Sequence, residues 1–180
     1  MDWKKLSKRV MNIPLRYVIL FTLINTIFLF YYGHIVTRVG LFLVCVVVLY
    51  FFGRLPFADV DPVPFTSALN YLFFGLPVAL QYAIWVCPAA DAMTGNFNQW
   101  TFVTLVSILA SLFVTSLFGF SPYYFLLVMI LLYNIIRLIL TSVLGSLGGA
   151  IISTTTNALL YFILSGLLLP IIEFGISVFR

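Results

Sequence analysis

The chain has very few charged residues. Nine Lys and Arg and five Asp and Glu among 180 residues make 8% of the sequence, whereas soluble domains average about 25%. Hydrophobic residues make up 63% and aromatic residues 18%. A soluble protein of this size cannot bury so much apolar surface. The composition therefore excludes an ordinary soluble domain and favours a polytopic membrane protein.

Residue types that carry out catalysis are also scarce. A single histidine excludes the H-E-x-x-H zinc motif. The sequence contains no G-x-S-x-G and no nucleotide-binding loop. The two cysteines, Cys45 and Cys87, fall at different predicted membrane depths, too far apart for the ~5.5 Å Cα separation that a disulfide prefers. We expect no enzymatic activity and no cofactor or metal.

The apolar residues are arranged in stretches of membrane-spanning length. A bilayer core of ~30 Å needs ~20 predominantly apolar helical residues for each crossing. We expect an all-α protein, a bundle of six transmembrane helices in a single domain over 1–180. The predicted spans are 15–32, 36–53, 65–87, 100–119, 123–144 and 150–172.

The basic residues predict the orientation of these spans. Lys4, Lys5, Lys8 and Arg9 come just before the first stretch, and Lys and Arg mark the cytoplasmic side. An even number of crossings then places both termini in the cytoplasm, in a protein of the cell (plasma) membrane. We therefore expect contacts with the lipid bilayer and with other membrane subunits, and no nucleic acid.

One arginine lies inside a predicted span. Arg137 falls within 123–144, where a charge costs at least ~2.5–3.5 kcal/mol on insertion scales. Asn134 shares its helical face, and Asn157 enters the next span at similar depth. Three interpretations remain open. Arg137 extends along lipid to the headgroups, pairs with Asp91 on the predicted outer side, or lines a polar cavity that binds a ligand.

The predicted span 65–87 is interrupted by polar and helix-breaking residues. Pro77 removes a helical hydrogen bond and predicts a kink, and Gln81 follows one turn later. Broken helices line the binding sites of many transporters, so both residues are candidates for a binding site. Packing of a kinked helix against a neighbour is the alternative.

A proline-rich elbow separates the second and third predicted spans. It contains Asp59, Asp61 and Pro62, and its three prolines forbid a continuous helix. Two carboxylates without further ligands fall short of a metal shell. We therefore expect an ordered inner loop whose Asp59 and Asp61 are either solvated charges or, together with Pro62, contacts for a partner protein.

The elbow and the end of the third span together suggest a family. The elbow Asp59-Val60-Asp61-Pro62 and the run Ala89-Ala90-Asp91-Ala92-Met93-Thr94-Gly95 lie within residues 59–105. In six predicted spans this pattern resembles the superfamily that includes the S-components of energy-coupling-factor transporters and the rod-shape protein MreD. The resemblance implies a non-enzymatic membrane subunit that captures a small solute for uptake. Its alternative is an MreD-like scaffold that organises a protein complex.

Overall fold

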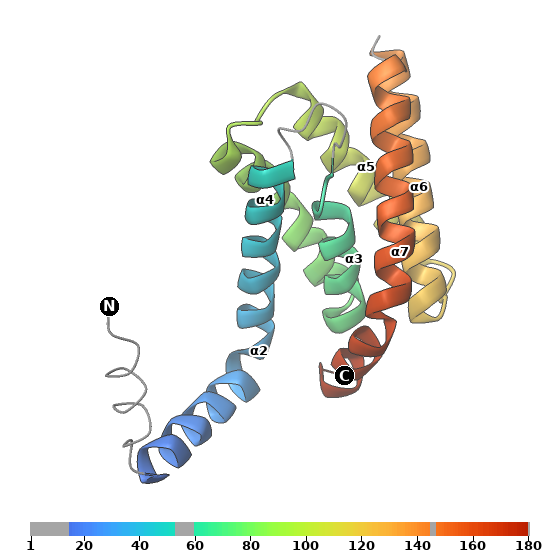
Figure 1. The fold of residues 1–180 in the computed structure, drawn as a ribbon. Helices are drawn as coiled ribbons and strands as arrows, with labels where there is room; N and C mark the ends of the chain where they lie inside the picture. The colour runs from blue at the N-terminus through green and yellow to red at the C-terminus, as the bar shows by residue number, and fades with distance from the viewer. Residues whose placement is uncertain (1–14, 53–59, 145–146, 180) are drawn as a thin grey trace. The chain divides into compact units, whose positions relative to one another are not determined.

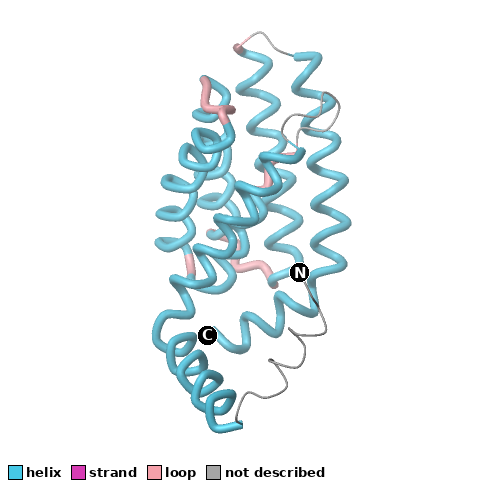
Figure 2. Tube along the Cα trace, turned by 60° about the vertical axis from the view of Figure 1, so that its left-hand side comes forward, coloured by secondary structure: helices cyan, strands magenta, loops and turns pink. Residues whose placement is uncertain are grey.

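The computed structural model describes residues 15–52, 60–144 and 147–179, with side chains for 33–52, 60–144, 151 and 154–177. All regular structure in this part of the chain is α-helical, and the loops drawn in pink are short (Figure 2). The helices are α2 (Leu15–Phe52), α3 (Val63–Phe74), α4 (Leu76–Thr94), α5 (Gln99–Ser116), α6 (Pro122–Val143) and α7 (Leu147–Phe179).

The first two predicted spans form one continuous helix. α2 runs through the expected turn at Gly33 and His34 without a break. An isolated glycine costs a helix about 1 kcal/mol, and this stretch has no proline to stop it. The chain divides into two compact units, 1–37 and 38–180. The description below concerns the second unit.

The third predicted span consists of two helices that reverse direction at Gly75. Gly75 has φ 85° and ψ 177°, a conformation that is essentially restricted to glycine. The Cys45 thiol of α2 contacts the hydroxyls of Thr66 (3.1 Å) and Tyr82 (3.7 Å), which lie on either side of Gly75. α3 and α4 therefore lie side by side and antiparallel (Figure 1). Pro77 lies in the first turn of α4, where its missing N–H costs no hydrogen bond, so the reversal at Gly75 replaces the predicted kink.

The connection between α4 and α5 is shorter than expected. α4 continues through Pro88, and the predicted outer loop over 88–99 is reduced to a turn between Thr94 and Gln99. Gly95 ends α4 in the left-handed conformation, with φ 75°. Asn98 then caps α5 in a capping box with Thr101.

α3 lies inside the second unit. Every residue from Val63 to Asn70 is buried. The Phe65 ring stacks on Tyr161 of α7 at 5.5 Å, and the Tyr71 ring stacks on Phe125 of α6 at 4.0 Å between centroids. The short α3 is thus held between α6 and α7.

The described part of the chain has an apolar exterior and a partly polar interior. Large hydrophobic side chains are exposed along α2, α5, α6 and α7, whereas many hydroxyl and amide side chains are buried. The segments Gly33–Phe52, Gln99–Ser116, Pro122–Val143 and Thr154–Ser177 are long and apolar enough to cross a membrane. The all-helical prediction is confirmed. Four described helices meet these criteria, compared with the six spans predicted.

Candidate functional site

A buried, non-helical segment precedes α3. Val60, Asp61 and Pro62 have no regular structure and are all buried. The first N–H groups of a helix need partners outside it. The Asp61 carboxylate supplies one by accepting a 3.1 Å hydrogen bond from the backbone N–H of Val63, while Pro62 and Pro64 have no N–H to satisfy. The prolines and Asp61 together allow a helix to begin inside the protein.

Asp61 also connects the start of α3 to α6 and α7. The Tyr133 hydroxyl donates to Asp61 Oδ2 at 2.9 Å. The backbone N–H of Asp61 donates to Asn157 Oδ1 at 3.1 Å. The Arg137 guanidinium carbon lies 5.9 Å from the centroid of the Tyr133 ring. We call Asp61, Tyr133, Arg137 and Asn157 the Asp61 centre. Its hydrogen bonds make the burial of a carboxylate tolerable.

The centre brings together residues that the sequence separated. Tyr133 lies halfway along α6. The predicted topology placed Asp61 in an inner loop and Arg137 toward the outer side, but both belong to one centre. The reversal at Gly75 explains the change, because it turns α4 back toward the end of the second unit at which α3 begins.

The residues predicted to contact a partner protein occupy a different environment from the one expected. Asp61 is 7% exposed and Pro62 is buried, whereas Asp59 lies outside the described residues. A buried side chain meets a partner only after its neighbours have moved. In this structure Asp61 and Pro62 therefore make their contacts inside the protein.

The other predicted binding residues are dispersed. Asp91 is half-buried at the end of α4, and its Oδ2 accepts a 2.6 Å hydrogen bond from the Thr101 hydroxyl. Pro77 and Gln81 are exposed on α4. Asn134 is buried on α6, where its Nδ2 donates to Ile130 O at 2.9 Å. Asn157 and Arg137 thus belong to the centre, Asn134 lies beside it in sequence, and Asp91 joins α4 to α5.

Sequence reasoning missed Tyr133 and Tyr161. Tyr133 precedes Arg137 by one helical turn, and that spacing places both side chains on one face. The spacing was the available signal for Tyr133. Tyr161 lies one turn after Asn157 and is fully buried against Phe65. An aromatic residue in an aromatic-rich span gives no comparable signal.

Several buried polar atoms have no hydrogen-bond partner among the described residues. An unpaired polar group away from water costs free energy comparable to a lost hydrogen bond. On α6 and α7 these atoms include Asn134 Oδ1, Thr154 Oγ1, Asn157 Nδ2 and the Tyr161 hydroxyl oxygen, and on α3 they include Ser67 Oγ and Asn70 Oδ1. These atoms leave part of the interior's hydrogen-bonding capacity unused.

No group of three or more His, Cys, Asp or Glu side chains that could hold a metal occurs within 15–52, 60–144 and 147–179. Cys45 and Cys87 are both free and buried.

The fold and the centre define a class of protein. Where the structure describes it, the chain is all-α, with apolar helices compatible with an integral membrane protein. Comparisons with protein-family models, curated proteins and solved structures find no match.

Proposed function

We propose that the chain is a non-enzymatic integral membrane subunit that captures a small polar solute at the Asp61 centre. The observation that carries the proposal is the buried, non-helical segment Val60–Pro62 beside the middle of α6. At membrane depth, irregular backbone is tolerated where protein buries it or where it lines a water-filled cavity. In transporters such discontinuous helices form the substrate site.

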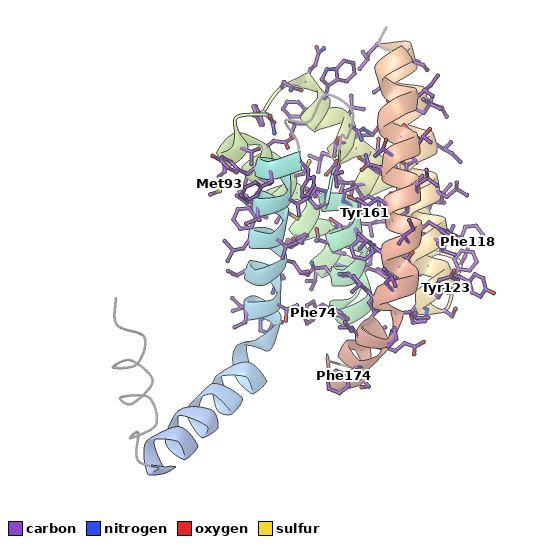
Figure 3. The ribbon with its side chains drawn as sticks, in the orientation of Figure 1. Phe74, Met93, Phe118, Tyr123, Tyr161 and Phe174 are labelled. Carbon is purple, nitrogen blue, oxygen red and sulfur yellow. The ribbon has the colours of Figure 1, made fainter. Side chains whose placement is uncertain are left out.

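Exposed aromatic residues support a position of the Asp61 centre within the hydrocarbon layer of the membrane. Phe97 is 51% exposed in the α4–α5 turn, and Phe118 and Tyr124 are 65% and 60% exposed near the α5–α6 turn. Figure 3 shows the Phe118 and Tyr123 side chains projecting from that second turn. Aromatic belts mark membrane interfaces. The 18 residues of α5 between the turns span about 27 Å, close to the hydrocarbon thickness.

The MreD-like scaffold is the alternative. It relied on the inner elbow from Asp59 to Pro64 and on aromatic helix faces as surfaces for partner proteins. The burial of Asp61 and Pro62 gives the elbow no support as such a surface.

A thermal-shift screen of detergent-purified protein tests the proposal. The panel contains water-soluble vitamins, amino acids and divalent metal ions. A solute at about 100 times its Kd adds about 2.7 kcal/mol of stability. We expect at least one compound to raise the Tm of the wild type but not of Asn157→Leu. The control is Thr155→Val, an exposed residue of the same helix whose hydroxyl donates to its own helix, to Ile151 O.

A flat panel together with a stoichiometric co-purifying membrane protein would contradict solute capture and favour the scaffold.

A further inference from the structure

The exposed side of α4 differs from the exposed sides of the helices that follow it. α4 exposes Gln81 and, one turn later, Trp85, which is 73% exposed. The spacing of four residues places both side chains on one face. The exposed side chains in the middle of α5 and α6 are hydrocarbon, as at Val106 and Ile135. α4 thus presents hydrogen-bonding groups where these helices present apolar groups.

Gln81 and Trp85 lie at the depth of the hydrocarbon layer. α4 and α5 are side by side and joined by a short turn, so they cover the same depth, and α5 is long and apolar enough to cross a membrane. Trp85 is the middle residue of the 19 in α4, and Gln81 lies about 6 Å from it along the helix axis. Indole rings are usually found at the membrane interfaces. Hydrocarbon offers no partner to the indole N–H or to the Gln81 amide.

A second copy of the chain satisfies the Gln81 amide by symmetry. An amide carries both a donor and an acceptor, so two glutamines that face each other form two hydrogen bonds. Two copies inserted in the same direction are related by an axis along the membrane normal. This axis brings each residue opposite its counterpart at the same depth. A different protein would have to supply a polar group at that depth, whereas a second copy always does.

We propose that two copies of this chain associate in the membrane through the exposed side of α4, with the Gln81 amides of the two copies hydrogen-bonded to each other. The Trp85 rings pack beside the amides, as tryptophans do in the centre of protein interfaces. The charged residue of α4 is Asp91, which lies near the end of the helix and accepts a hydrogen bond from Thr101. The middle of the two faces therefore meets without like-charge repulsion.

The affinity between copies tests the proposal. Donor-labelled and acceptor-labelled copies of the purified full-length protein are mixed in liposomes, and Förster transfer is followed as the lipid-to-protein ratio rises. We expect the wild type to dimerise and Gln81→Leu to weaken the dimer about tenfold, the effect of two hydrogen bonds between helices. Gln99→Leu is the matched control, because Gln99 is exposed at the start of α5, outside the α4 face. It should dimerise like the wild type.

Cysteine cross-linking tests which face is involved. In a chain with Cys45→Ala and Cys87→Ala, Ile84→Cys is introduced, and native membranes are oxidised with copper phenanthroline. Ile84 is 46% exposed on α4, three residues from Gln81 and on the same face. We expect disulfide-linked dimers from Ile84→Cys and none from Val106→Cys, a position on α5 that is 53% exposed. Adding Gln81→Leu should lower the yield of the Ile84→Cys dimer.

A wild type that stays monomeric at every lipid ratio, or equal affinities of the wild type and Gln81→Leu, would overturn the proposal. Equal yields of dimer from Ile84→Cys and Val106→Cys would also overturn it. So would a cross-link from Ile84→Cys to a different protein, because α4 would then contact another subunit. The outcome is independent of the proposed solute capture, which the thermal-shift panel tests at the Asp61 centre.

Discussion

The two buried tyrosines of α6 and α7 form a matched pair for testing the Asp61 centre. Tyr133 and Tyr161 are 0% and 1% exposed, and each can be replaced by phenylalanine without changing the packed ring. The Tyr133 hydroxyl donates to the Asp61 carboxylate at 2.9 Å. The Tyr161 hydroxyl has no hydrogen-bond partner among the described residues. The same substitution should therefore have different effects at the two positions.

The structure gives the sign and size of each effect. A hydrogen bond to a charged group contributes about 1.5–3 kcal/mol, although pairs measured inside membrane proteins average about 0.6 kcal/mol, with a maximum near 1.7. We therefore expect Tyr133→Phe to lower the free energy of unfolding by about 1–2 kcal/mol. Tyr161→Phe removes an unsatisfied buried group, so it should leave stability unchanged or raise it. The phenyl ring at position 133 still offers a face to Arg137.

Reversible unfolding in mixed detergent micelles, followed by helical circular dichroism and tryptophan fluorescence, measures both variants. The wild type and Thr155→Val serve as references. Equal losses for the two tyrosine variants, or a larger loss for Tyr161→Phe, would refute the assignment of hydrogen bonds at the centre.

Two further predictions use the same unfolding measurement. Gly75→Ala should destabilise the protein by about 1–3 kcal/mol, because alanine is strained at φ 85°. Gly166→Ala in α7 has open space around the new Cβ, so it should stabilise the protein by about 0.5–1 kcal/mol. Similar effects of the two substitutions would argue against a reversal at Gly75. Thr101→Val should cost about 1–2 kcal/mol, because it removes the donor to Asp91 and half of the capping box. It should leave unchanged the Tm increase that a bound solute produces in the thermal-shift screen; loss of that increase would tie Asp91 to the solute site.

The helical class could be predicted from composition, because the shortage of charge leaves few other folds for so many apolar residues. The number and direction of the helices could not. Gly33 and His34 look like a turn between two spans, yet the helix continues through them. The aromatic-rich stretch 65–87 looks like one span, yet its direction depends on the backbone conformation of Gly75. Hydropathy predicts neither the continuation of α2 through Gly33 nor the reversal at Gly75.

Part of the candidate site followed from the sequence. Arg137 and Asn157 were chosen because polar groups inside apolar spans are costly, and the structure places both at the Asp61 centre. Asp61 was assigned to a solvated elbow because it lies among prolines, and the sequence does not indicate that the elbow enters the interior. Pro77 and Gln81 were chosen for their residue types, but their exposure on α4 separates them from the centre.

Cross-linking between positions 61 and 157 tests the central claim that α3 begins inside the bundle. Asp61→Cys and Asn157→Cys are combined in a chain whose Cys45 and Cys87 are replaced by alanine, and the shortest bis-methanethiosulfonate reagent is added to native membranes. Because the Asp61 backbone N–H lies 3.1 Å from Asn157 Oδ1, we predict rapid cross-linking, and none between Asp61→Cys and Ser177→Cys. The topology expected from hydropathy would separate positions 61 and 157 by much of the ~30 Å hydrocarbon core. Absence of the 61–157 cross-link, with both cysteines reactive, would contradict the account.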